Sequence, residues 1–144
     1  MRKAGWLILL ILGLGWAQEG RAERLKSLRI ALITEALELT PEEAQVFWPV
    51  YNARDAALQK HREDIHDQIL RLRAERKDIP PQAYADSVSA LYFRLWEGEA
   101  SIRKAYHDRL LKVLSPQKVA KLYMTELRML RRALGEGGPP PHGR

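Results

Sequence analysis

Few side chains in this sequence could perform catalysis or bind a metal ion. It contains four histidines and no cysteine, so thiol catalysis and zinc–thiolate sites are excluded. His61 and His66 lie five residues apart, about 140° around a helix, and therefore cannot converge on one metal. His61 could meet His107 if two long helices pair antiparallel, and these two are the candidate metal ligands. The favoured alternative is that His61 is hydrogen-bonded in a helix interface.

No catalytic constellation is recognisable. The sequence lacks a glycine-rich phosphate loop, a nucleophile elbow and the His-Glu-x-x-His pattern of zinc proteases. We therefore expect a protein without enzymatic activity, cofactor or resident metal.

Arginines and aromatic residues form the pattern that indicates binding. They are interspersed with apolar residues between positions 62 and 109. Such a surface could attract unfolded chains by charge and hold them loosely by apolar contact. The predicted client-binding residues are Arg62, Arg71, Arg94, Arg103, Arg109, Tyr92, Phe93 and Trp96.

Positive charge is concentrated near the C-terminus, where residues 115–144 carry six basic and two acidic side chains. Lys118, Lys121, Arg128 and Arg132 are spaced by three, seven and four residues, so they share one helix face. Such a face is ordinarily just solvated. A basic amphipathic helix can also bind acidic partners or lipid headgroups.

The first of two similar helix starts lies at Leu39-Thr40-Pro41-Glu42-Glu43. Thr40 is a suitable N-cap, and Pro41 suits the first helical position, where its missing N–H costs nothing. Glu43 completes a capping box with Thr40.

The second start lies at Leu114-Ser115-Pro116-Gln117-Lys118. Ser115 is again a cap and Pro116 a first helical residue, but Lys118 cannot act as Glu43 does. Capping signals occur in any helical protein. The occurrence of two copies favours a helical hairpin used twice.

The apolar periodicity predicts an all-α fold of four helices in two hairpins, at about 21–39, 41–77, 82–114 and 116–134. Two long antiparallel helices with shorter flanking ones would form a thin layer. On the first helix we expect Leu25 and Leu28 on the packed face, and on the third we expect Gly98 to admit a large side chain or a close backbone. On the last helix the residues expected to point inward are Val119, Leu122, Leu127, Leu130 and Leu134.

The N-terminus has the features of a secretory signal peptide. Met1-Arg2-Lys3 is basic, an apolar run follows to Trp16, and small residues precede Ala17. We expect a leader over residues 1–17, a helical domain over residues 18–134 and a disordered tail over residues 135–144. An apolar run of about 13 residues is short for a membrane span, which needs roughly 20, although an uncleaved anchor is the alternative. Export removes nucleic acid as a natural partner.

The two Leu-Thr/Ser-Pro starts and the leader resemble the Spy/CpxP family, which is named for two Leu-Thr-x-x-Gln motifs. The final Gln of the motif is Glu43 in one copy and Lys118 in the other. The segment from Phe47 to Asn52 is similar to relatives described as periplasmic metal or envelope-stress sensors.

The resemblance implies a thin, curved homodimer in the periplasm. It further implies an ATP-independent chaperone for unfolded or misfolded envelope proteins. The alternative is a stress or heavy-metal sensor that restrains a membrane signalling partner.

Overall fold

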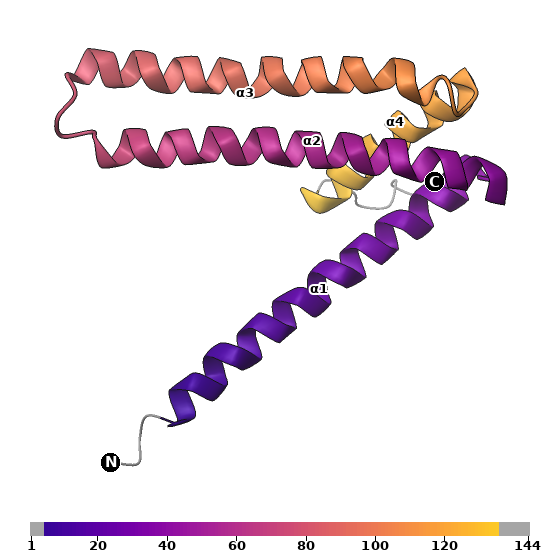
Figure 1. Ribbon diagram of the computed structural model, residues 1–144, viewed down its shortest axis with the longest axis horizontal. Helices are drawn as coiled ribbons and strands as arrows, with labels where there is room; N and C mark the ends of the chain where they lie inside the picture. Colours follow the sequence, from indigo (N-terminus) through magenta and orange to yellow (C-terminus); the bar gives the residue numbers. More distant parts are fainter. Residues whose placement is uncertain (1–4, 136–144) are drawn as a thin grey trace, which may run out of the picture. The chain divides into compact units, whose positions relative to one another are not determined.

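The computed structural model describes the backbone of residues 5–135 and the side chains of residues 20–135. Over these residues the chain forms four helices and no strand, which confirms the all-α prediction (Figure 1). The helices are α1 (Gly5–Leu37), α2 (Pro41–Ala74), α3 (Pro81–Leu110) and α4 (Pro116–Ala133). They belong to two compact units: a hairpin unit of residues 40–119, and a terminal unit of residues 1–39 and 120–144.

In the hairpin unit α2 and α3 run antiparallel, joined at one end by a turn (Figure 1). Near the turn Arg76 stacks on Tyr84, and further along the pair His61 contacts the α3 backbone at Arg94 and Leu95. Pro49 lies inside a continuous α2, so the helix does not break there. The buried apolar residues of this unit are Phe47, Tyr51, Leu58, Ile65, Leu91, Leu110, Leu114 and Val119.

Both long helices end earlier than the apolar periodicity predicts. After α2 the chain turns, with the Asp78 N–H donating to the Glu75 carbonyl at 2.9 Å. After α3 the Lys112 and Val113 N–H groups bond carbonyls three residues back, at 3.2 and 3.1 Å. This tighter winding ends α3 before Pro116. A proline disfavours helical conformation in the residue that precedes it. After α3 the apolar pattern continues through the turn because Val113 and Leu114 still pack, whereas residues 75–78 after α2 are charged and exposed.

The terminal unit contains α1 and most of α4, and Ile33, Leu37 and Leu122 are fully buried in it. α1 begins at Gly5 rather than near residue 21. It ends at Leu37 because Glu38 adopts a left-handed conformation with φ of 49°, and the Leu39 N–H then bonds the Thr34 carbonyl at 3.2 Å.

The predicted inward faces of this unit need correction. Leu122 is buried as expected, as is Val119 at the end of the hairpin unit, but Leu127 and Leu130 of α4 and Leu134 directly after it are exposed by 54%, 55% and 65%. Leu25 and Leu28 of α1 are exposed as well. Helical spacing aligns residues on one face, but the face is buried only where a partner lies against it.

None of the helices, over the part of the chain that the structure describes, combines the length and apolar character needed to span a bilayer. The side chains of the predicted leader, and all of the predicted tail except Gly135, lie outside the described residues.

Candidate functional site

Three aromatic side chains lie on the surface of α3. Tyr92, Phe93 and Trp96 are exposed by 58%, 59% and 54%. Tyr92 makes edge-to-face contacts with Phe93 and Trp96, with ring centroids 5.6 and 6.1 Å apart. These three residues, called the aromatic patch below, place rings at the surface where they can contact another molecule.

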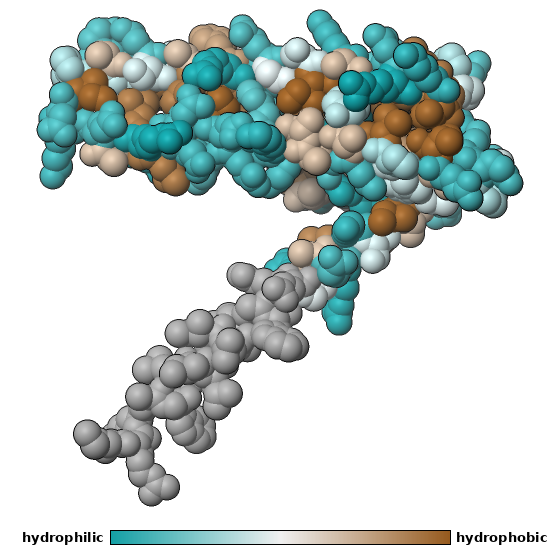
Figure 2. All heavy atoms as spheres, viewed as in Figure 1, coloured by the Kyte–Doolittle hydropathy of each residue, from teal (hydrophilic) through white to brown (hydrophobic). Residues whose placement is uncertain are grey.

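An apolar groove of about 280 Å³ continues from the aromatic patch between α2 and α3. Tyr92 belongs to both features, so they form one surface. Apolar residues reach the surface of the hairpin unit between hydrophilic ones (Figure 2). The groove is lined by Ile65, Ile69, Leu72, Arg73, Tyr84, Val88, Leu91, Tyr92 and Leu95.

Two of the predicted client-binding arginines are bound to a buried acid. Arg62 Nε donates to Glu99 Oε1 at 2.6 Å, and Arg103 Nη1 donates to Glu99 Oε2 at 2.7 Å. The Glu99 side chain is only 8% exposed, whereas both arginines are about half exposed, at 46% and 49%. Glu99 follows Tyr92 by seven residues, which places this cluster on the same helix face as Tyr92. The cluster carries a net charge of +1 beside the aromatic patch.

The electrostatics of this cluster favour the ionised acid. Burial alone would raise the pKa of Glu99, but the hydrogen bonds from Arg62 and Arg103 outweigh burial, and the pKa lies below its ordinary value. The pKa of Arg62 is raised, primarily by the same hydrogen bond. Both arginines are therefore held in place, with about half of each side chain still exposed to solvent.

The other predicted arginines lie elsewhere. Arg71 and Arg94 line a second, polar groove of about 340 Å³, and Arg94 Nη1 donates to Gln68 Oε1 at 2.9 Å. Leu72 and Leu91 line both grooves, so the polar groove lies across the α2–α3 contact from the apolar one. The Arg109 guanidinium stacks 4.7 Å from the ring centroid of Tyr106. The structure therefore does not gather the five arginines on one face.

His61 packs onto α3 at Gly98. Its Nε2 lies 3.1 Å from the Arg94 carbonyl and 3.2 Å from the Leu95 carbonyl. Both partners are acceptors, so Nε2 must carry the proton. A Cβ atom at position 98 would overlap the imidazole ring, which confirms that Gly98 admits a large side chain.

The structure does not bring the two candidate metal ligands together. His61 meets α3 near Gly98, and His107 lies nine residues further along, about 13 Å along the helix axis. Among the described residues, no group of three or more His, Asp or Glu side chains could hold a metal ion. His61 is a hydrogen-bonded residue of a helix interface, as the favoured alternative had it.

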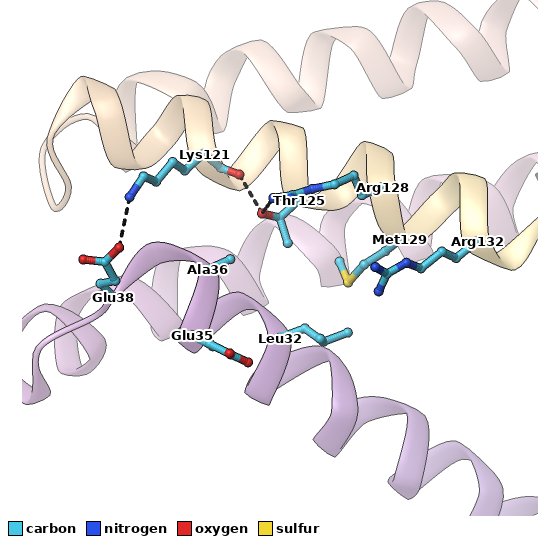
Figure 3. Close-up of a pocket in the computed structure, with 9 residues that line it drawn as sticks. All are labelled: Leu32, Glu35, Ala36, Glu38, Lys121, Thr125, Arg128, Met129 and Arg132. Atoms are coloured by element: carbon cyan, nitrogen blue, oxygen red, sulfur yellow. Dashed lines mark hydrogen bonds and ion pairs between the residues drawn. The ribbon is translucent and has the colours of Figure 1, made fainter. Parts of the chain in front are cut away.

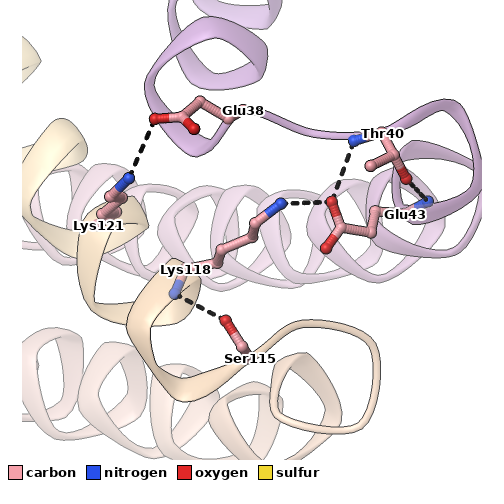
Figure 4. A network of polar contacts seen from close by, with 6 residues as sticks. All are labelled: Glu38, Thr40, Glu43, Ser115, Lys118 and Lys121. Atoms are coloured by element: carbon pink, nitrogen blue, oxygen red, sulfur yellow. Dashed lines mark hydrogen bonds and ion pairs between the residues drawn. The ribbon is translucent and has the colours of Figure 1, made fainter.

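The two capped helix starts meet through Glu43 and Lys118 (Figure 4). Lys118 Nζ donates to Glu43 Oε2 at 2.5 Å. The same Glu43 oxygen accepts the Thr40 N–H at 3.0 Å, and Thr40 Oγ1 accepts the Glu43 N–H at 3.2 Å, which completes the predicted capping box. Ser115 Oγ accepts the Lys118 N–H at 3.3 Å, as expected of a cap. The hydrogen bond from Lys118, with that from Thr40, lowers the pKa of Glu43.

A separate groove of about 460 Å³ lies in the terminal unit between α1 and α4 (Figure 3). Lys121, Arg128 and Arg132 of the predicted basic face line it, opposite Glu35 and Glu38. Lys121 Nζ lies 3.3 Å from Glu38 Oε1, and Arg128 Nη2 donates to Thr125 Oγ1 at 3.2 Å. Lys121 and Arg128 of the basic face thus form contacts within the terminal unit, and the groove is lined by both basic and acidic side chains.

Sequence reasoning missed the buried Glu99 and the Glu43–Lys118 pair. Glu99 follows Leu95 by four residues on the packed face and precedes Arg103 by four. This spacing could have predicted a buried acid paired with an arginine. The Glu43–Lys118 pair joins residues 75 positions apart, and local spacing contains no signal for it.

Comparison of the chain with protein-family models, with curated proteins and with solved structures yields no match.

Proposed function

We propose that this protein is an ATP-independent chaperone of the periplasm that binds unfolded or aggregation-prone proteins, and that it belongs to the Spy/CpxP family. The observation that carries the proposal is the aromatic patch: three adjacent rings on one helix are each more than half exposed. Exposed contiguous apolar surface usually marks an interaction site.

The surroundings of the aromatic patch favour loose binding over a tight, specific complex. The apolar groove joins the aromatic patch at Tyr92, and Arg62 and Arg103 on the same hairpin unit are half exposed. Arginine and aromatic side chains dominate the energetics of many protein interfaces. Long-range attraction by charge and short-range contact by the rings suit clients that share no sequence.

The test measures aggregation of a chemically denatured client by light scattering, with the protein in excess, at low salt and without nucleotide. We expect the wild-type chain to suppress aggregation. The variant Tyr92→Ser/Phe93→Ser/Trp96→Ser should require several times more protein for the same suppression, because the apolar contact is removed while the charge is kept.

The matched control is Val46→Ser/Leu70→Ser, which removes apolar side chains that are 48% and 47% exposed elsewhere on the hairpin unit. This variant should suppress aggregation as the wild type does, and circular dichroism should show equal helicity for all three proteins. Failure of the wild type to suppress aggregation contradicts the proposal. Equal loss in the patch and control variants contradicts the assignment of the site.

A further inference from the structure

The outer face of α4 carries an exposed aliphatic stripe. Met124, Leu127, Leu130 and Leu134 are exposed by 58%, 54%, 55% and 65%. They step by three, three and four residues, so they cover an arc of about 120° over three helical turns. The packed side of the same helix is distinct and contains the buried residues Val119, Leu122 and Thr125. α4 therefore packs on one side and presents a continuous apolar stripe on the other.

Positive charge lies along the edge of the aliphatic stripe. By helical spacing Arg131 lies within the arc, and Arg128 lies about 40° outside it, on the side of the groove that it also lines; both are exposed. The described residues of the terminal unit, 20–39 and 120–135, carry eight basic and four acidic side chains, a net charge of +4. The hairpin unit carries thirteen basic and twelve acidic side chains, a net charge of +1. The aliphatic stripe thus belongs to the more positive part of the described chain.

These features point to a planar anionic partner. The stripe is straight and aliphatic, with arginines whose long stems can lie along apolar surface while their heads reach outward. A helix with leucines on one face and arginines at its edges lies in the headgroup region of a membrane, and anionic lipids strengthen its binding. We propose that α4 docks with its aliphatic stripe on the surface of an anionic lipid bilayer.

This docking goes beyond the proposed chaperone function. The aliphatic stripe lies in the terminal unit and the aromatic patch in the hairpin unit, and they share no residue. Surface binding also requires no membrane-spanning helix.

The test uses the full chain with one environment-sensitive fluorophore, which is straightforward because the sequence has no cysteine. The label is placed at Met124→Cys on the stripe, or at Ala100→Cys on α3 as the control. The probes are vesicles of equal parts phosphatidylglycerol and phosphatidylcholine, and vesicles of phosphatidylcholine alone. We expect a blue shift only for the Met124→Cys label, only with the anionic vesicles, and weaker at high salt.

Two further pairs of variants, made in the Met124→Cys background, separate apolar from charge contributions. Leu127→Ser/Leu130→Ser should reduce vesicle affinity at least tenfold, whereas Val46→Ser/Leu70→Ser should leave it unchanged. Arg128→Gln/Arg131→Gln should reduce affinity roughly thirtyfold, because each arginine near an anionic surface contributes about 1 kcal/mol. Arg71→Gln/Arg73→Gln removes the same charge from the hairpin unit and should have a much smaller effect.

Several results would overturn the proposal. An equal shift at both labels, or on neutral vesicles, indicates adsorption that does not use the stripe. A shift that grows with protein concentration alone indicates a second copy of the chain as occupant. A shift caused by a denatured acidic protein but not by vesicles indicates a protein partner. Because these readings come from α4 itself, they are independent of the aggregation assay.

Discussion

Gly98 is the residue at which α3 makes room for a side chain of α2. Glycine inside a helix costs up to about 1 kcal/mol relative to alanine, so its presence needs a compensating reason. The reason is the imidazole of His61, which occupies the space of a Cβ and donates to two carbonyls of α3. A sequence position that weakens the helix thereby permits a close contact between helices.

Gly98→Ala should therefore destabilise the protein by about 1 kcal/mol, because overpacking of about 1–3 kcal/mol exceeds the gain in helix propensity. Urea unfolding followed by circular dichroism measures this change. Gly20→Ala is the control, because no atom lies within 4 Å of its added Cβ, and its stability should be unchanged or higher. The double variant His61→Ala/Gly98→Ala should be more stable than Gly98→Ala alone. If it is not, the overlap with His61 is not the cause.

Glu99 is an acid held ionised in a nearly buried position. A carboxylate there is tolerated because Arg62 and Arg103 supply charge-assisted hydrogen bonds to both of its oxygens. The two arginines that were expected to bind clients therefore have a structural role first. Their exposed portions are what remains for a partner.

The depressed pKa of Glu99 makes stability depend on pH in a defined direction. The folded-state pKa lies below the ordinary value of 4.5, so the stabilisation is full above that value and is lost as the pH falls through the folded-state pKa. We expect urea unfolding to show this loss below about pH 4.5. Glu99→Gln should lower the free energy of unfolding by about 1–2 kcal/mol at neutral pH. It should also make the loss of stability at acidic pH, called the acid limb below, less steep.

Glu97→Gln is the matched control, since Glu97 is an exposed acid on the same helix. It should change neither the stability at neutral pH nor the acid limb. Some acid dependence should survive in Glu99→Gln, because the pKa of Glu43 is lowered as well. An acid limb as steep as that of the wild type in Glu99→Gln would contradict the assignment.

At the scale of the elements, the two capped helix starts are joined by charge. Each motif first caps the helix that it begins: Thr40 caps α2, and Ser115 caps α4. The fifth residues of the two motifs, Glu43 and Lys118, then form an ion pair, and their side chains are 29% and 22% exposed. A carboxylate in one copy and an ammonium in the other therefore link the starts of α2 and α4.

A double-mutant cycle of Glu43→Gln and Lys118→Gln tests this link. Gln at position 43 keeps the capping box, so the cycle isolates the contact with Lys118. Each single variant should lower Tm, and the double variant should lower it by less than the sum of the two. The coupling should weaken at high salt.

The control cycle uses Lys60→Gln and Asp64→Asn. These residues form an ion pair within α2 that is 76% and 55% exposed, and its coupling should be within about 0.5 kcal/mol of zero. Additive effects of the two substitutions on Tm would show that Glu43 and Lys118 are not energetically coupled.

At the scale of the whole molecule, the two units carry different exposed apolar surfaces. The hairpin unit presents aromatic rings beside a groove, and the terminal unit presents a straight aliphatic stripe with a higher positive charge. We propose that the first binds unfolded clients and that the second binds anionic lipid. The aggregation and vesicle assays therefore use separate variants, and either assignment can fail alone.

The sequence by itself determined the four helices, the Thr40 capping box and the Ser115 cap. These depend on local chemistry: caps bond N–H groups within one turn, and helical spacing aligns apolar residues whether or not a partner exists. The same locality made the early end of α3 hard to predict, because the turn after α3 keeps the apolar pattern.

Tertiary structure alone decided which aligned residues are buried and which charges meet. Leu127, Leu130 and Leu134 have the spacing of a core face but lie exposed, because burial requires a second element against that face. His61 meets Gly98 rather than His107, because the length of the α2–α3 turn sets the register of the hairpin. Glu43 and Lys118 meet across 75 positions, a proximity that arises only from packing.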